Sequence, residues 1–209
     1  MSVSDGRLAR LVLFALLILF LLGGSRRRLD HWRVDVLPGH RVDRWVKVVD
    51  GTASLLPPRV RACQIRTIFN GWMTCRRFQR VGGCILGCAD EEDSINHYAQ
   101  CLHYHGLCRK FLGLRTPPPH LRLEDFLGIR PWPYSLPEHC RGSAGKNFAA
   151  AVRAVSVSAL YKTHNAIRHG ATTEAAAQFA FRGYIRESVR GHGEAMKLCT
   201  MAFSAPLPQ

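Results

Sequence analysis

The sequence predicts a mainly α-helical protein, because apolar side chains recur at helical spacing and do not alternate as they do in a strand. One clear example comprises four side chains at positions i, i+3, i+4 and i+7, namely Val42, Trp45, Val46 and Val49. Glycine and proline divide the chain into stretches of helical length. We therefore expect a small helical domain with a cysteine-containing turn, preceded by an N-terminal apolar helix.

The N-terminal segment, residues 1–28, holds an uncharged run of 14 residues from Leu11 to Gly24. A full membrane span needs about 20 residues, so this run, extended to residues 8–24, would form a short membrane anchor. A cleaved signal segment and a buried helix are the alternatives. Three arginines follow the run, and basic residues stay on the cytosolic side of a membrane. An inserted run would leave the remaining chain in the cytosol, whereas an unused run is compatible with a nuclear or cytoplasmic protein.

The remaining chain divides into five segments. They are a linker with a short helix, an arginine-rich unit, a proline-rich connection, a C-terminal helical pair and a tail, at residues 29–57, 58–113, 114–145, 146–191 and 192–209. In the arginine-rich unit we expect helices at 59–80 and 95–112, the first of which Asn70-Gly71 could interrupt. In the C-terminal pair we expect helices at 146–169 and 173–190, each closed by a glycine.

The chain carries a net charge of +14, and arginine supplies 24 of its 29 basic residues. Arginine forks bind phosphate through paired hydrogen bonds, so this composition favours a nucleic acid partner first and an anionic membrane second. No acidic residue lies between Gly51 and Ala89. We expect the arginines of the helix at 59–80 to bind RNA or DNA, chiefly Arg66, Arg76, Arg77 and Arg80. Trp72 and Phe78 could stack on unpaired bases, although their helical spacing is more typical of core positions.

Three cysteines and one histidine follow at the spacing Cys84-x3-Cys88-x8-His97-x3-Cys101. Gly87 allows a tight turn that brings the first two thiols together, and His97 and Cys101 would share one helix face about 6 Å apart. Three thiolates and one imidazole form a closed tetrahedral site, and this soft ligand set favours structural Zn²⁺. The alternative is a helix whose cysteines are ordinary small core residues. An acidic side chain within residues 90–93 could orient the His97 ring.

The strings NGWMTCRRFQ, CILGC and EDSINHYAQC together resemble the zinc-binding module that follows the polymerase domain in reverse transcriptases of non-LTR retrotransposons. Asp93-Ser94, His97 and Cys101 match the helix motif of that module, and Cys84 and Cys88 match its preceding pair. The resemblance covers residues 58–113, with a weaker resemblance over 159–190. It implies a zinc-stabilised, nucleic-acid-binding region that derives from the C-terminal part of such an enzyme.

The sequence does not favour catalysis. Polymerases hold two metal ions with carboxylates, usually from an Asp-Asp motif, and this sequence contains no adjacent pair of aspartates. It also lacks a nucleophile elbow and a glycine-rich phosphate loop, so we expect neither an enzyme nor a small-molecule substrate. Two alternatives to nucleic acid binding remain: a membrane-anchored interaction module with a zinc site, and a decayed retroelement reading frame without a function.

Overall fold

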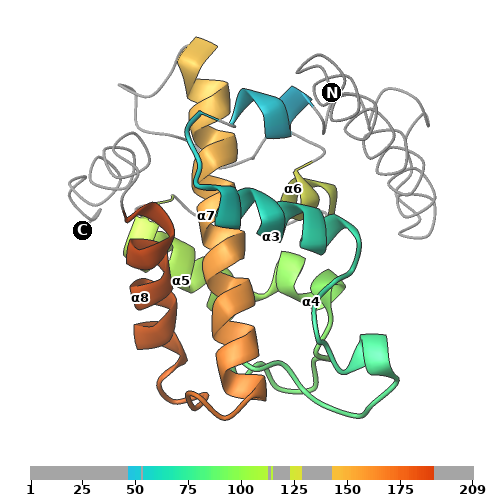
Figure 1. The fold of residues 1–209 in the computed structure, drawn as a ribbon. Coiled ribbons are helices and arrows are strands. Elements are labelled where there is room, and N and C mark those ends of the chain that lie inside the picture. Colours follow the sequence, from blue (N-terminus) through green and yellow to red (C-terminus); the bar gives the residue numbers. More distant parts are fainter. Residues whose placement is uncertain (1–46, 53, 113, 115–122, 129–142, 191–209) are drawn as a thin grey trace, which may run out of the picture.

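The computed structural model describes residues 47–52, 54–112, 114, 123–128 and 143–190, which are mainly helical as the sequence predicts (Figure 1). These residues contain no β-strand, only an isolated antiparallel bridge between Gly83 and Glu92. None of their helices is long and apolar enough to cross a membrane. The expectations for residues 1–28, for the tail and for most of the linker and the proline-rich connection fall outside the described residues.

Helix α7, Ser143–Arg168, is the central element of the described residues, and α3, Pro58–Ile68, and α8, Ala177–Val189, pack directly against it (Figure 1). The shorter helices are α4, α5 and α6, at Ile95–Gln100, Leu102–Leu112 and Leu123–Leu127. A single 3-10 turn, η1, spans Arg76–Phe78. Residues 151–160 of α7 are all buried and are mostly alanine, valine and serine, so neighbouring helices can approach α7 closely on several sides.

The arginine-rich helix expected at 59–80 ends at Ile68. Asn70 adopts a left-handed conformation with φ of 53°, and the N–H of Gly71 donates to the carbonyl of Arg66 at 2.6 Å. A Cβ atom on Gly71 would lie 3.0 Å from that same carbonyl oxygen, so glycine suits this close approach. The chain then continues as an irregular segment that contains only η1. We call residues 69–83 the arginine loop.

The helix expected at 95–112 is also divided, into α4 and α5, because Cys101 is extended with ψ of 113°. Ser94 caps α4 as its position predicts, since its Oγ accepts the N–H of His97 at 3.1 Å. Cys101 begins the second helix in a similar way, and its Sγ accepts the N–H of Tyr104 at 3.4 Å. His97 and Cys101 therefore do not share one helix face, because Cys101 lies at the junction between two helices.

The C-terminal helical pair agrees with its prediction except at one boundary. Gly170, with φ of 70°, follows the end of α7 as expected. Helix α8 begins at Ala177, a few residues later than predicted, because residues 173–177 first form tight turns with i to i+3 hydrogen bonds. Residues 47–51 are helical, which agrees with the described part of the helix expected around Val49.

Trp72 lies at the centre of the core, although it follows the end of α3. Its ring is fully buried, and its indole N–H donates to Thr67 Oγ1 at 3.0 Å. Four aromatic rings surround it with centroid distances of 5.4 to 6.1 Å, namely Tyr98, Phe126, Tyr161 and His164. Trp72 is thus a core residue, as its spacing indicates, and its ring is not accessible to a nucleic acid base.

Candidate metal centre and arginine-rich surface

A short hairpin places the two cysteines of the CILGC turn. The N–H of Cys84 donates to the carbonyl of Glu91 at 2.8 Å, and the N–H of Asp93 donates to the carbonyl of Gly82 at 3.0 Å. Between these paired segments, Gly87 has φ of 82° and donates its N–H to the carbonyl of Cys84. This left-handed turn suits glycine, as the sequence predicts. It directs both thiols toward the start of α5.

The structure brings the four predicted ligands Cys84, Cys88, His97 and Cys101 together, and we call them the metal cluster. One ligand atom from each lies within 4.8 Å of all the others. The sulfur of Cys101 is 4.0 Å from that of Cys84 and 3.5 Å from that of Cys88. Four ligands around a metal at a metal–sulfur distance of about 2.3 Å would place sulfurs about 3.8 Å apart. The cluster could therefore hold a metal ion.

The imidazole of His97 is held in the orientation of a metal ligand. Its Nδ1 lies 3.1 Å from Glu91 Oε2, a distance at which an Nδ1–H group donates a hydrogen bond to the carboxylate. Its Nε2 is buried and has no hydrogen-bond partner among the residues that the structure describes. A carboxylate on one ring nitrogen and a metal on the other is the usual arrangement of zinc-bound histidine. Glu91 is one of the four acidic residues at 90–93 that the sequence suggested for this role.

One of the three thiols, Cys84, is prepared to lose its proton. A hydrogen bond with the Cys101 thiol holds the pKa of Cys84 well below its usual range, and the N–H of Leu86 contributes at 3.4 Å from the sulfur. The same hydrogen bond, together with burial, raises the pKa of Cys101, and burial raises the pKa of Cys88. One thiolate therefore forms first, and metal binding would displace the remaining protons.

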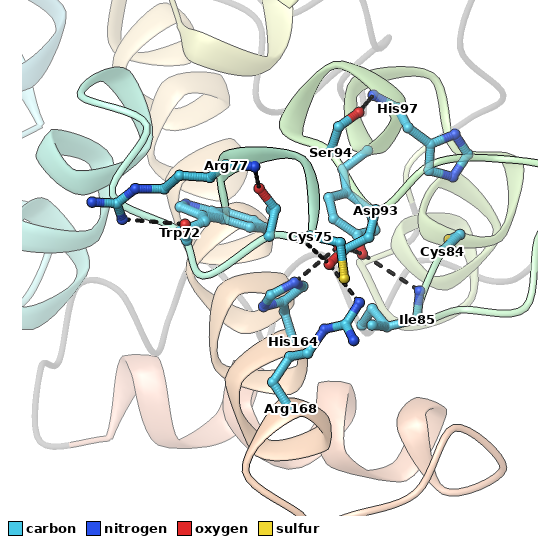
Figure 2. A network of polar contacts seen from close by, with 12 residues as sticks. Trp72, Cys75, Arg77, Cys84, Ile85, Asp93, Ser94, His97, His164 and Arg168 are labelled. Carbon is cyan, nitrogen blue, oxygen red and sulfur yellow. Dashed lines mark hydrogen bonds and ion pairs between the residues drawn. The ribbon is translucent and has the colours of Figure 1, made fainter. Parts of the chain in front are cut away.

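Asp93 forms a second polar centre that sequence reasoning missed (Figure 2). Its fully buried carboxylate accepts hydrogen bonds from Tyr98 Oη at 2.6 Å and from the N–H of Cys75 at 2.8 Å. From α7 it receives His164 Nε2 at 3.0 Å and Arg168 Nη2 at 2.5 Å. Burial alone would raise the pKa of Asp93, but the hydrogen bonds from His164 and Tyr98 outweigh burial and lower it below its ordinary value.

The Asp93 centre ties three parts of the chain together. Figure 2 shows Cys75 of the arginine loop, Asp93 of the hairpin, and His164 and Arg168 of α7 meeting at one carboxylate.

The sequence suggested Asp93 as a helix cap or as an acid that orients His97, but Ser94 provides the cap, Glu91 contacts His97, and Asp93 has a different role. Asp93 directly precedes the capping serine, and an acidic residue at such a position usually interacts with the helix N-terminus at the surface. The position alone therefore gave no indication that Asp93 is buried.

All four predicted nucleic-acid-binding arginines are exposed, but they do not form one helix face. Arg66 lies on α3, with its guanidinium 5.9 Å from the ring centroid of Tyr161. Arg77 donates to the backbone carbonyl of Trp72 at 3.3 Å. Arg76 forms an ion pair with Glu92 at 2.6 Å. Arg76, Arg77 and Arg80 therefore belong to the arginine loop and its 3-10 turn, which corrects the expected arginine-rich helix.

The spacing of Phe78 favoured a core position, but the structure exposes this residue. Its side chain is 48% exposed, and Met73 and Val81 of the same loop are exposed as well. The helix that would have buried it ends ten residues earlier, at Ile68. Hence the arginine loop presents both charged and apolar side chains to solvent.

A metal ion bound by the cluster would have three thiolates and one imidazole as ligands, which can fill all four positions of a tetrahedron. Such a set would leave no ligand position for water or a substrate, and it would hold the hairpin against the start of α5.

A search with this chain found no matching family model, no matching curated protein and no matching solved structure.

Proposed function

We propose that the protein is a zinc-stabilised nucleic-acid-binding protein without polymerase activity, derived from the C-terminal region of a retrotransposon reverse transcriptase. The observation that carries the zinc assignment is the grouping of three sulfurs with the imidazole of His97, whose Nε2 is buried and has no hydrogen-bond partner among the described residues. Soft thiolates with one imidazole favour zinc over oxygen-preferring cations. The resemblance of the CILGC turn and the Asp93-to-Cys101 helix to the retrotransposon module supports the same assignment.

The nucleic acid assignment is supported by charge and exposure. The cluster anchors the hairpin beside the arginine loop, where Arg76, Arg77 and Arg80 are exposed. No acidic residue interrupts the sequence from Gly51 to Ala89. Binding through such arginines is expected to depend strongly on salt and weakly on sequence, because phosphate contacts release counterions and do not identify bases.

Metal content tests the first half of the proposal. The full-length chain, purified under reducing conditions, is expected to contain one zinc ion per chain by elemental analysis. Cys84→Ala should lose that zinc, whereas Cys63→Ala should keep it, because Cys63 is buried on α3 outside the cluster. Wild-type protein without zinc, or a Cys84→Ala variant that retains it, would contradict the ligand assignment.

The salt dependence of nucleic acid binding tests the second half. Replacement of Arg76, Arg77 and Arg80 by alanine should weaken binding and reduce the slope of log K against log salt by about one unit or less per lost contact. The matched control replaces three exposed arginines outside the loop, Arg109 of α5 and Arg182 and Arg186 of α8, by alanine. An unchanged salt slope in the loop variant would mean that the binding surface lies outside the arginine loop. Binding to anionic vesicles without binding to nucleic acid would favour the membrane alternative.

A further inference from the structure

We propose that Phe78 is a stacking platform for an unpaired base, so that the arginine loop binds single-stranded rather than double-stranded nucleic acid. The inference rests on the proposed nucleic acid partner and specifies which form of it the loop binds. Phe78 and Trp72 are both aromatic residues of the loop, yet Trp72 is fully buried whereas Phe78 is 48% exposed. An exposed phenylalanine offers a flat apolar surface that every base can cover.

Two arginines flank this ring. The guanidinium carbons of Arg77 and Arg80 lie 5.4 and 6.0 Å from its centroid. Both distances are within the range of cation–π contacts, so a base that stacks on Phe78 would take the place of one of these guanidinium groups on the ring. Both are near enough to bind the phosphates on either side of a base that stacks on Phe78. The arrangement therefore combines an aromatic surface with positive charge, as single-strand-binding surfaces do.

The backbone holds Phe78 in place before any ligand arrives. The N–H of Phe78 donates to the carbonyl of Cys75 at 3.1 Å, and the N–H of Arg80 donates to the same carbonyl at 2.9 Å. The N–H of Cys75 is itself bound by the buried Asp93 carboxylate. The turn that carries Phe78 is thus attached to the core. A ring on a fixed turn loses little conformational freedom when a base stacks on it, which favours binding.

A groove next to the platform determines where the strand can run. It has a volume of about 750 Å³ and is lined by Arg76 and Arg80 on the loop and by carboxylates of residues 90–92 on the hairpin. Phosphates would be repelled from the acidic side, so a strand would lie along the loop side of the groove, which carries Arg80. A strand can take that path, whereas a broad membrane surface would also meet the carboxylates. The bases of a duplex are already stacked on both faces and cannot reach Phe78.

The test measures the affinity of the full-length chain for three probes: oligouridine, the same oligomer annealed to its complement, and an abasic oligomer of equal length. Phe78→Ala should lower the affinity for oligouridine by about 5- to 150-fold and leave its salt slope unchanged. The affinity for the abasic oligomer should stay the same, because that probe carries phosphates without bases. Phe78→Trp should restore binding, and Phe179→Ala, an exposed aromatic on α8, should have no effect.

The outcomes separate this inference from the proposed function. Phe78→Ala could bind oligouridine as wild type does, while the variant without Arg76, Arg77 and Arg80 shows a reduced salt slope. That result would overturn the stacking platform, and the nucleic acid partner would stand. If Phe78→Ala weakens the abasic and uridine probes equally, the residue acts by supporting the loop and stacking is overturned. If wild-type protein binds none of the probes, both proposals are overturned.

Discussion

The metal cluster and the arginine loop are neighbours along the chain and share the hairpin, yet they use their side chains in opposite ways. In the cluster, Cys84, Cys101 and His97 turn toward one point, and a buried ring nitrogen has no partner among the described residues. In the loop, Arg76 and Arg77 turn outward and already contact Glu92 and the carbonyl of Trp72.

This difference determines how far each region specifies its partner. A buried set of converging donors selects a ligand by number, geometry and softness, because an unfilled buried donor set is costly. Exposed guanidinium groups are well solvated and select only the sign of a partner's charge. The cluster therefore points to one class of ion, whereas the loop needs the additional feature of Phe78 before it points to one form of nucleic acid.

The largest expected effect is the loss of metal. Structural zinc supplies on the order of 10 kcal/mol of binding free energy, which stabilises the folded state only while the ligands are present. A chelator should therefore lower the thermal midpoint of the wild-type chain strongly, and His97→Ala should reproduce that loss without chelator. Calorimetry with and without chelator measures both. If chelator lowers the thermal midpoint of His97→Ala as much as that of the wild type, His97 is not a metal ligand.

Asp93→Asn should cost about 3 kcal/mol of unfolding free energy, because it leaves Arg168 and His164 facing a neutral side chain. The amide also presents a donor where the carboxylate accepted hydrogen bonds. Denaturant unfolding measures the cost, and elemental analysis should show unchanged zinc content. This result would show that Asp93 and the metal cluster stabilise the fold independently. Loss of zinc in the variant would show that the cluster depends on Asp93.

The pH dependence of the Asp93 effect has a definite sign. The pKa of Asp93 is lower in the folded chain than in the unfolded chain, so the carboxylate stabilises the fold above its ordinary pKa of about 3.9. That stability is lost as the pH falls below this value toward the folded pKa. The difference in unfolding free energy between wild type and Asp93→Asn should therefore be largest near neutral pH and shrink in acid. A constant difference would contradict an ionised Asp93.

Two adjacent glycines, Gly82 and Gly83, lie where the arginine loop joins the hairpin, and they differ in how much room they leave for a side chain. A Cβ on Gly82 would lie 2.4 Å from the buried Cys75 sulfur, whereas a Cβ on Gly83 meets nothing closer than 3.7 Å. We expect Gly82→Ala to lower the unfolding free energy by about 1–3 kcal/mol and Gly83→Ala to change it by less than about 0.5 kcal/mol. Equal effects in denaturant unfolding would mean that the Cys75 side chain moves aside.

Among the charged side chains considered, the smallest stability effect is expected at Glu92. Its ion pair with Arg76 joins side chains that are 44% and 63% exposed, so Glu92→Gln should change the unfolding free energy by less than about 1 kcal/mol. The freed Arg76 should strengthen nucleic acid binding and steepen the salt slope by about one unit. Glu174→Gln, another exposed carboxylate, serves as the control. Weaker nucleic acid binding by Glu92→Gln would show that the ion pair holds Arg76 in the position needed for binding.

Much of the candidate site could be predicted from the sequence because it depends on local geometry. The Cys84–Cys88 turn requires only a few residues and a glycine, and a carboxylate near His97 was expected from the intervening acids. The division of the helix at Cys101 was not predicted, because i, i+4 spacing indicates a continuous helix until tertiary contacts interrupt it. The ligands nevertheless meet, since Cys101 at the helix junction still directs its sulfur to the cluster.

The sequence by itself determined the helical class, the four residues of the cluster and the surplus of arginine. Tertiary structure alone decided that Asp93 is a buried centre, since its partners His164 and Arg168 lie 71 and 75 residues away. It also decided that Trp72 is buried and Phe78 is exposed. Periodicity assigns both rings to the same kind of position, and only the end of α3 at Ile68 and the packing around α7 distinguish them. Burial depends on which distant segments cover a side chain, and no local pattern contains that information.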